Sequence, residues 1–588
     1  MNAHTRTKVI CTIGPSCNTL EMMKELIRSG MNVARLNFSH GTLAEHLLSI
    51  QNLKKARDEL KVPLAIMLDT KGPEIRLGKI KDGQILLQAG HIWLLKAENV
   101  EGNEHSVTIT PHSVLKKLEP GQRVLFDDGY VGSRVLENRA DGVVVKIENS
   151  GVIRSGKGVN IPNVSLDLPA LTEKDMDDIR FGCENDIDLI AASFIRSADN
   201  VLAIRKLLTD HKKADTLIIA KIENHEGVQN FDSIIQVADG VMIARGDLGV
   251  EVPLSQVPRL QKMMIRKCYL AGKPSVTATQ MLESMIHNPR PTRAEASDVA
   301  NAIYDSTSAV MLSGETAIGK YPLETVQVMG TIIREAEEDF NYPAFFDQHA
   351  KFVYHDVPSA VTLATVKTAY SSSCKAIFAF TSSGSTARLL SRLRPSMPIV
   401  AVTPFVKTYH QLSFNWGVVP VLRQSQSLRE AYEIASAYAL ESNFVEYGDL
   451  VLMTAGTPFG IAGTTNMMVV ESIGDVLVRG TQGYGAHIHG NVIPILSSEN
   501  IRPYRVRGCI IVISRYDDSY QFLVQEATGV ILQNNIEDVD SEKNLLEFAK
   551  KINRSCIVRA DDALHILKEG QLITLAPEKA LVYKGVVL

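Results

Sequence analysis

The feature that most constrains the fold is an alternation that runs from residue 7 to residue 340. Short β-branched apolar runs are followed, in most cases, by amphipathic segments with helical spacing, and the first such segment ends at Gly30. This alternation is typical of βαβ units, which build parallel sheets. The apolar runs are residues 8–13, 32–38, 64–69, 189–194, 216–222, 240–246, 274–280 and 309–314. Eight parallel strands, each followed by a helix, predict an α/β fold, the (β/α)8 or TIM barrel.

The alternation is interrupted once and then restarts. About a hundred residues, rich in glycine and short alternating strands, separate the third run from a helix expected near Thr172, which predicts an inserted small β-barrel domain over the barrel mouth, a lid. From about Asp356 a separate open, mostly parallel α/β domain is expected. The Gly-rich segment 474–490 is expected to be a linker into an extra C-terminal α/β domain. The predicted domains are 1–70 with 170–342 (barrel), 71–169 (insert), 343–473 (α/β domain) and 474–588 (extra domain).

Composition narrows the class of function. The formal charge of −4 gives no electrostatic footprint for nucleic acid or an anionic membrane. The first residues lack the pattern of a secretory signal, and no apolar run approaches the length of a membrane span. The seven cysteines are scattered without the spacing of a zinc site or a disulfide framework. We therefore expect a cytoplasmic protein with no nucleic-acid or membrane partner.

The ends of the predicted strands carry the candidate site. In barrels of this kind the active site lies at the carboxyl ends of the strands. A single polar residue there is more often a salt-bridged rim residue, but seven strands that each deliver a polar group favour one shared pocket. These residues are Arg35, Asn37, Ser39, His40, Asp69, Thr70, Ser193, Phe194, Lys221, Glu223, Arg245, Gly246, Asp247, Thr279, Gln280, Ser313 and Glu315.

The chemistry of these groups suits an anionic substrate. Glu223 and Asp247 end adjacent strands and can share one hard divalent cation, Mg²⁺ or Mn²⁺. Arg35 and Arg245 offer planar forks for carboxylate or phosphate. Lys221 is a compact cation that can neutralise charge developing in a transition state. The set predicts phosphoryl transfer, in which positioning and charge neutralisation supply most of the catalysis.

Several long motifs follow one another along the chain: "NVARLNFSHG", "LDTKGPEIRLG", "KIENHEG", "ARGDLGVE", "TATQMLESM", "PTRAEASDVANA" and "MLSGETA". They resemble the signature segments of the pyruvate kinase family, in unbroken order from about residue 5 to about residue 473. The resemblance implies an enzyme that transfers the phosphoryl group of phosphoenolpyruvate to ADP, giving pyruvate and ATP at the last step of glycolysis. It also implies a homotetramer.

The resemblance assigns roles to individual residues. Lys221 matches the catalytic lysine, and Thr279 lies where the enolate is protonated; Arg35 and Arg76 are the other groups expected to take part in catalysis. Ser313 and Glu315 match groups behind the proton-transfer side. The residues expected around phosphoenolpyruvate are Arg35, Lys221, Gly246, Asp247 and Thr279. Those expected around the nucleotide are Arg76, Lys157, His40 and Asn37. Glu223 and Asp247 match the Mg²⁺ ligands.

A monovalent cation site is implied as well. Asn37, Ser39, Asp69 and the carbonyl of Thr70 match the K⁺ ligands of the family. A glutamate in the "GPEIR" segment accompanies K⁺ dependence, whereas a lysine there replaces the charge of the ion. This chain has Glu74 at that place, so we expect K⁺ dependence.

Two later segments complete the resemblance. Residues 381–388, "TSSGSTAR", are similar to the effector phosphate loop, for a sugar phosphate or a nucleotide, although an ordinary N-capped helix would have the same pattern. The loop residues are Thr381, Ser382, Ser383, Gly384, Ser385 and Thr386. The segment 454–474 resembles bacterial, Bacillus-like members, which carry an extra C-terminal domain similar to the phosphohistidine domain of phosphoenolpyruvate-utilising enzymes. Residues 529–551 contain no histidine where relatives have one, and His565 falls later, so a degenerate domain is expected.

Two other functions are compatible with part of this pattern. A barrel lyase acting on pyruvate-like substrates would use the same pair of carboxylates, but it would not need the insert or contacts from Arg76 and Lys157. A regulatory binding protein on the same scaffold would be favoured by loss of Lys221, Glu223 or Asp247, and all three are present.

Overall fold

The computed structural model describes residues 5–164, 166–351, 356–425, 427–457 and 463–587. Residues 458–462, part of the segment that resembles the Bacillus-like members, lie outside the described residues. The chain divides into two compact units. One comprises Met1–Val366, Ala379–Gln424 and Ala455–Asn466, and the other Lys367–Phe378, Ser425–Thr454 and Met467–Leu588.

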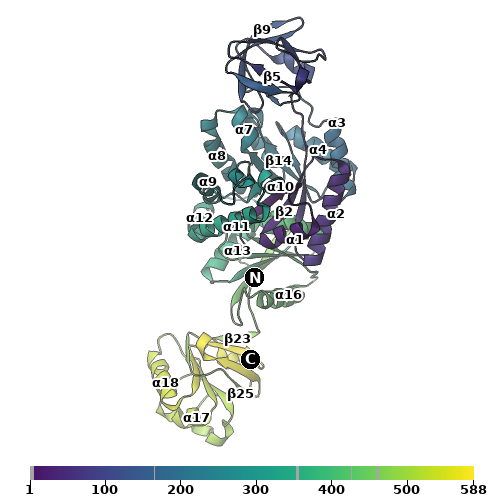
Figure 1. The fold of residues 1–588 in the computed structure, drawn as a ribbon. Coiled ribbons are helices and arrows are strands. Elements are labelled where there is room, and N and C mark those ends of the chain that lie inside the picture. Colours follow the sequence, from purple (N-terminus) through teal and green to yellow (C-terminus); the bar gives the residue numbers. More distant parts are fainter. Residues whose placement is uncertain (1–4, 165, 352–355, 426, 458–462, 588) are drawn as a thin grey trace. The chain divides into compact units, whose positions relative to one another are not determined.

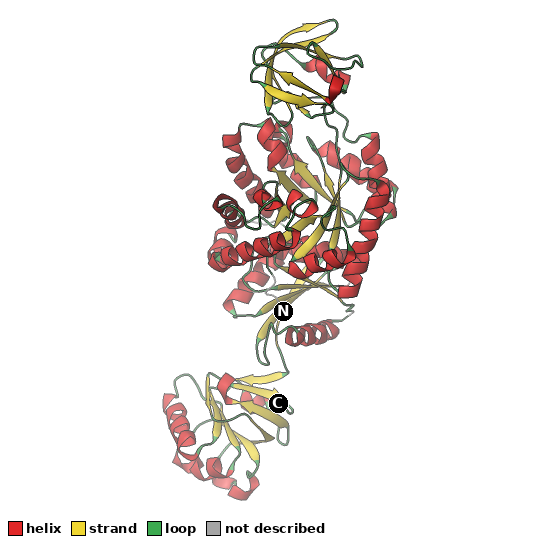
Figure 2. Ribbon diagram, in the orientation of Figure 1, coloured by secondary structure: helices red, strands yellow, loops and turns green. Residues whose placement is uncertain are grey.

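The predicted (β/α)8 barrel is confirmed (Figures 1 and 2). Its parallel strands close in the order β1-β17-β16-β15-β14-β13-β3-β2, and each begins within one residue of its predicted run. The strands are β1 (Lys8–Thr12), β2 (Met31–Asn37), β3 (Ala65–Asp69), β13 (Leu189–Ala192), β14 (Leu217–Ile222), β15 (Gly240–Ala244), β16 (Ser275–Ala278) and β17 (Ala309–Leu312).

Helices surround this barrel, and local sequence sets several of their ends. Thr42, Thr172 and Thr292 begin α2, α3 and α9 with capping boxes, and Gly30, at φ 122°, ends α1 as predicted. The helices are α1 (Leu20–Ser29), α2 (Leu43–Leu60), α3 (Glu173–Glu184), α4 (Ala198–Asp210), α5 (His225–Gln229), α6 (Phe231–Val237), α7 (Arg245–Glu251), α8 (Val257–Leu270), α9 (Arg293–Tyr304), α10 (Gly314–Ala317), α11 (Pro322–Asp339) and α12 (Tyr342–His349).

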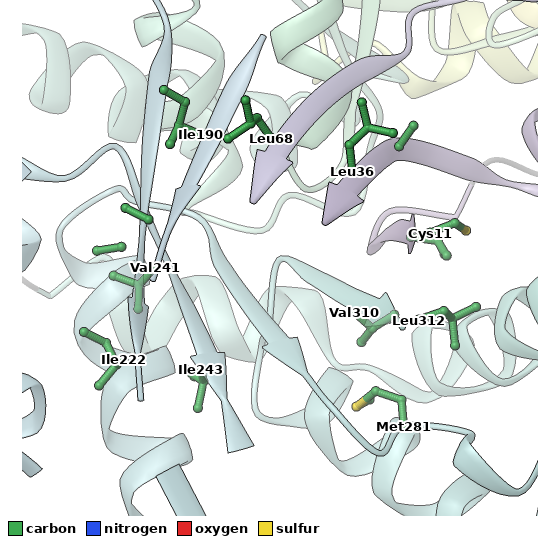
Figure 3. Close-up of a cluster of buried hydrophobic side chains, with 14 of the residues drawn as sticks. Cys11, Leu36, Leu68, Ile190, Ile222, Val241, Ile243, Met281, Val310 and Leu312 are labelled. Atoms are coloured by element: carbon green, nitrogen blue, oxygen red, sulfur yellow. The ribbon is translucent and has the colours of Figure 1, made fainter. Parts of the chain in front are cut away.

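Each barrel strand is buried on both faces, which is why it reads as an apolar run. In β3, Ala65 and Met67 belong to the cluster inside the barrel, whereas Ile66 and Leu68 belong to the cluster between strands and helices. Figure 3 shows the second cluster, with Leu68 beside Ile190 of the neighbouring strand β13. Because side chains alternate along each strand, one face packs inside the barrel and the other packs against the helices. The strand ends are therefore left for polar groups.

The insert between β3 and α3 is all-β, as predicted. A seven-stranded sheet and a two-stranded sheet enclose one core that includes Trp93 and Phe126. Asp127, Asp128 and Gly129 have φ values of 51°, 53° and 82° and form a turn. The strands are β4 (Arg76–Leu77), β5 (Gln84–Leu87), β6 (Ile92–Lys96), β7 (Ser106–Thr110), β8 (Arg123–Phe126), β9 (Val131–Arg139), β10 (Gly142–Ile147), β11 (Gly151–Arg154) and β12 (Val159–Asn160).

Beyond α12 a second α/β region follows. Its five strands are ordered β20-β19-β18-β21-β22, and β19 and β20 are parallel. The elements are α13 (Val357–Ser371), β18 (Ala376–Phe380), α14 (Ser385–Ser391), β19 (Ile399–Thr403), α15 (Val406–Gln411), β20 (Val418–Leu422), α16 (Leu428–Glu441), β21 (Leu450–Gly456) and β22 (Thr465–Ser472). Among the residues that the structure describes, no helix is both long and apolar enough to span a membrane.

The last region is an eight-stranded mixed sheet, and it corrects one prediction. The Gly-rich segment 474–490 is not a linker, because β23, β24 and the start of β25 lie within it. A Cβ atom on Gly480 would lie 2.3 Å from Ile557 Cγ2, so this glycine permits close packing. The elements are β23 (Val476–Arg479), β24 (Gln482–Tyr484), β25 (Ile488–Ile495), β26 (Cys509–Ile513), α17 (Gln521–Glu526), β27 (Gly529–Leu532), α18 (Val539–Ile552), β28 (Ser555–Val558), α19 (Ala563–Ile566), β29 (Leu572–Ala576) and β30 (Leu581–Lys584).

Candidate active site

A buried lysine lies at the centre of the barrel rim. Lys221, at the end of β14, donates from Nζ to Ser193 Oγ at 2.7 Å and to Asp69 Oδ1 at 2.9 Å. Its Nζ also lies 3.1 Å from Glu223 Oε1. Burial disfavours the charged amine, but the carboxylates of Asp69 and Glu223 outweigh burial and raise the pKa of Lys221 above its ordinary value. The lysine is therefore a fixed positive charge.

Asp69, on β3, connects this lysine to an arginine on the neighbouring strand. Arg35 Nε donates to Asp69 Oδ2 at 2.6 Å, and Arg35 also donates to Thr12 Oγ1 at 2.8 Å. Asp69 is fully buried. Burial raises the pKa of Asp69, but the adjacent cations Arg35 and Lys221 outweigh that effect and hold the pKa below its ordinary value. Two cations thus share one carboxylate.

Two carboxylates end the adjacent strands β14 and β15. Glu223 is 2% exposed and accepts the Phe194 N–H on Oε2 at 2.6 Å. Burial and the negative charge of Glu223 raise the pKa of Asp247 to about 7. Such a pair suits a hard divalent cation, which would remove their repulsion. Within the described residues no three His, Cys, Asp or Glu side chains gather as a metal site.

The ends of β15 and β16 are in close contact. A Cβ atom on Gly246 would lie 2.8 Å from Thr279 Cγ2, so only glycine fits beside Thr279. Thr279 and Gln280 have φ values of 75° and 57°, a strained conformation for residues other than glycine. The Arg245 fork was expected to be available to an anion, and here the structure differs. Arg245 donates to the Thr279 carbonyl at 2.7 Å and pairs with Asp298 at 2.7 Å, so it supports the strained turn.

The four residues expected around K⁺ come from two neighbouring strand ends. Asn37 and Asp69 are paired in the register of β2 and β3. Asn37 Oδ1 accepts the Ser39 N–H at 3.1 Å, and the Thr70 carbonyl accepts Ser193 Oγ at 2.6 Å. The set offers oxygen ligands only, as a hard cation requires.

A cavity of about 740 Å³ is lined by residues of both the barrel and the insert. Three of the residues expected near the nucleotide line it, namely His40, Arg76 and Lys157, and so does Asp247. Arg76 donates to Glu74 Oε2 at 2.5 Å. Lys157 Nζ lies 2.8 Å from Asp127 Oδ1, so Asp127 has a site contact beyond its place in a turn. The fourth expected residue, Asn37, does not line the cavity.

The candidate effector loop is compact. Gly384 has a φ of 79° and donates its N–H to Thr381 Oγ1 at 3.0 Å. The Ser382 carbonyl accepts Thr408 Oγ1 at 2.8 Å, and Thr386 Oγ1 lies 2.6 Å from Thr465 Oγ1. Ser383 is exposed at the tip, and Ser385 begins α14. The turn into a helix is as predicted, with part of its hydrogen-bonding capacity already used.

The structure adds partners to which no role was assigned from the sequence. Ser193 binds Lys221, Thr12 binds Arg35, and the Phe194 amide binds Glu223. Ser193 and Phe194 were among the predicted strand-end residues, whereas Thr12, the last residue of β1, was missed although the same position could have found it. Behind the site, Glu315 accepts the N–H groups of Leu282 and Ser313.

These contacts define an enzyme of the (β/α)8 class. Its buried cations can bind an anionic substrate, and a cavity lies beside them. The family described as "Pyruvate kinase, barrel domain" matches residues 4–326, and "Pyruvate kinase, alpha/beta domain" matches residues 359–471. The pyruvate kinase of Bacillus licheniformis is 43% identical over 588 residues, and that of Staphylococcus epidermidis 42% over 584, each covering 99% of both chains. The chain belongs to the pyruvate kinase family. It is accordingly a phosphotransferase of glycolysis.

Proposed function

We propose that this chain transfers the phosphoryl group of phosphoenolpyruvate to ADP with Lys221 facing the transferring group. The observation that carries the proposal is the fixed positive charge of Lys221, maintained by Asp69 and Glu223 at the barrel rim. A preorganised cation in a buried site stabilises the phosphoryl group as it moves to ADP and the negative charge left on the enolate oxygen. Similarity over the full length to pyruvate kinases supports the same reaction.

Phosphoenolpyruvate is expected to be held on the barrel side. Arg35 is fixed by Asp69 and Thr12, which leaves part of its guanidinium for the substrate phosphate. Gly246 and Asp247 lie in the first turn of α7. The Thr279 side chain packs against Gly246, which supports its assignment beside the substrate, where it would deliver a proton to the enolate.

Mg²⁺, or Mn²⁺ in its place, is assigned to Glu223 and Asp247. When bound, the ion supplies charge neutralisation between substrate oxygens. The chain's own contribution is to hold Glu223 by the Phe194 N–H, so that the carboxylate keeps its orientation.

The nucleotide is expected in the cavity. Arg76 and Lys157, which belong to the insert, would contact its phosphates, with His40 on the barrel side. Glu74 and Asp127 orient the two cations before the nucleotide arrives.

K⁺ is assigned to Asn37, Ser39, Asp69 and Thr70. The dependence is tested by pyruvate formation in K⁺ and in tetramethylammonium, with wild type and Glu74→Lys. We expect turnover of wild type only in K⁺, and turnover of the variant in both salts because its amine replaces the charge. Equal turnover of wild type in both salts would exclude the monovalent site.

The remaining assignments rest on the resemblance. They are the domain limits, an effector phosphate at residues 381–386, a homotetramer and a cytoplasmic location. For the extra domain we propose a stabilising or interface role, because polar groups after β27 link its loops: Gln533 accepts the Leu564 N–H at 2.7 Å, and Asn534 accepts the Arg559 N–H at 2.8 Å.

The experiment for the proposed function measures pyruvate from phosphoenolpyruvate and ADP with Mg²⁺ and K⁺. We expect turnover that requires both substrates. Absence of turnover, even with sugar phosphates and nucleotides added, would refute the proposal and favour a regulatory binding protein.

A further inference from the structure

Residues 193–196, the loop after β13, contact both the phosphoryl-transfer side and the insert. Ser193 binds Lys221, and the Phe194 N–H binds Glu223. Two residues further on, Arg196 donates from Nη2 to the Leu168 carbonyl at 2.6 Å and to the Pro169 carbonyl at 3.0 Å. These carbonyls belong to residues 166–171, the return segment, by which the chain passes from the insert back to the barrel.

Arg196 is itself held firmly. Its N–H donates to Asn200 Oδ1 at 3.0 Å, and its carbonyl accepts Asn230 Nδ2 at 2.8 Å. A Cβ atom on Gly227 would lie 2.6 Å from the Ile195 carbonyl, so the neighbouring backbone has no room to shift. Because its backbone N–H and carbonyl are both hydrogen-bonded, Arg196 can hold another segment in position with its side chain.

The Arg196 guanidinium also has an unused donor. The side chain is 8% exposed and lines the cavity, and Nη1 is buried without a hydrogen-bond partner among the residues that the structure describes. Buried guanidinium nitrogens are rarely left unpaired. We expect this unused N–H donor on the cavity wall to meet an acceptor when the insert adopts another arrangement or when a ligand binds.

We propose that Arg196 is a positioning residue that pins the return segment, and so fixes the insert's nucleotide-binding cations, Arg76 and Lys157, relative to Lys221 and Glu223. The outgoing crossing, at Gly72, has its own anchor, because the Gly72 N–H donates to Asp175 Oδ1 at 2.9 Å. The return crossing is held by the two bonds from Arg196, and just before it Asn160 of the insert donates to Glu251 of the barrel at 2.8 Å. The kinetic part of this proposal rests on the proposed function.

The kinetic test compares Arg196→Met with Arg205→Met. Arg205, in α4, also donates to two backbone carbonyls, of Ala214 at 3.3 Å and Thr216 at 2.9 Å, but both lie in the barrel. We expect the KM for ADP to rise about tenfold in Arg196→Met, with the KM for phosphoenolpyruvate within about twofold, because only the nucleotide uses the insert. Arg196→Lys should restore part of the loss, since one amine can reach a carbonyl but lacks the fork.

A second readout does not depend on activity. Spin labels at Glu137→Cys in the insert and Lys206→Cys in the barrel, at side chains 53% and 78% exposed, report their separation by pulsed EPR. A Cys509→Ser background avoids stray labelling, because the other six cysteines are buried. The distance distribution should broaden in Arg196→Met and Arg196→Lys, but not in Arg205→Met.

Unchanged distances in both Arg196 variants, or equal increases in the two KM values, would overturn the proposal. A wild type that turns over no phosphoenolpyruvate would refute the proposed function instead, and the EPR distances would still decide the role of Arg196.

Discussion

The two ends of the barrel both bury ion pairs, yet they use them differently. At the carboxyl ends of the strands, the rim, Arg35 and Lys221 share Asp69, at 2.6 and 2.9 Å. At the amino ends, the base, Arg57 of α2 lies 3.0 Å from Asp188, the residue before β13. At the rim the charges form a network, because two cations share Asp69 and Lys221 also lies 3.1 Å from Glu223; at the base one arginine faces one carboxylate.

The effect on each carboxylate follows from that difference. Burial raises the pKa of Asp188 and Arg57 only partly offsets it, whereas two cations hold the pKa of Asp69 below its ordinary value. At the base part of the remaining capacity goes to backbone groups: Asp188 accepts the Ile66 N–H at 2.8 Å, and Arg57 donates to the Leu64 carbonyl at 2.9 Å. A buried ion pair therefore does not mark an active site by itself; a network of several buried charges at the carboxyl ends of barrel strands is the stronger signal.

The largest expected effect is at the rim. Lys221→Met should lower kcat by roughly 10³-fold, because the charge facing the phosphoryl group is lost. Binding of phosphoenolpyruvate with Mg²⁺, measured by calorimetric titration, should change by less than about tenfold, since Arg35 remains. Lys213→Met is the control: Lys213 pairs with Asp186 at 2.8 Å outside the site, and its loss should leave kcat unchanged. Near-normal turnover of Lys221→Met would refute the assignment.

At the base a substitution should affect stability more than catalysis. Arg57→Met should cost about 3 kcal/mol of barrel stability, because Asp188 would remain buried without its cation. Scanning calorimetry measures the shift of the barrel transition. Below that transition kcat should stay within about twofold. Arg180→Met is the matched control, since Arg180 and Asp177 are 48% and 66% exposed, and less than about 0.5 kcal/mol is expected. A large loss of kcat in Arg57→Met would contradict the distinction between a catalytic rim and a structural base.

Removal of a proposed metal ligand should affect the rim alone. Glu223→Gln should raise the Mg²⁺ concentration for half-maximal activity about a hundredfold, because the carboxylate loses its charge while keeping its shape. Titration of activity with Mg²⁺ measures this. Glu295→Gln, which alters the capping box of α9, should leave the Mg²⁺ requirement unchanged. An unchanged requirement in Glu223→Gln would remove Glu223 from the metal site.

The smallest effect concerns a histidine at the base. His410 is 6% exposed and accepts the Leu64 N–H on Nδ1 at 3.4 Å. Burial lowers its pKa to about 3, so the folded state keeps it neutral while the unfolded state binds a proton below its ordinary pKa of about 6.5. Its contribution to stability is complete above pH 6.5 and decreases as the pH falls toward 3, by about 2 kcal/mol at pH 5.

His410→Asn should remove that part of the acid sensitivity. Unfolding in urea at pH 8 and pH 5 measures the difference between wild type and variant. His105→Asn, at a side chain 81% exposed, is the control and should retain the wild-type sensitivity. Equal acid sensitivity in His410→Asn and wild type would show that the residue is not held neutral.

Much of this was predictable because barrel strands are buried on both faces and end in polar groups. Each barrel strand begins within one residue of its predicted start, and the rim residues could be read from the strand ends. Segment 474–490 was misread because glycine marks both loops and close strand packing, as at Gly480. The partner of Arg245 was not predictable, because Asp298 is distant in sequence and only the folded chain brings the two together.

The most direct test of the central claim is single-turnover formation of ATP from phosphoenolpyruvate and ADP, followed by rapid quench in Lys221→Met and Arg57→Met. This measurement isolates the chemical step from binding and product release. The account predicts that Lys221→Met loses the step by roughly 10³-fold, while Arg57→Met transfers the phosphoryl group as fast as wild type. Similar rates in the two variants would contradict the claim that the rim, and not the base, carries the chemistry.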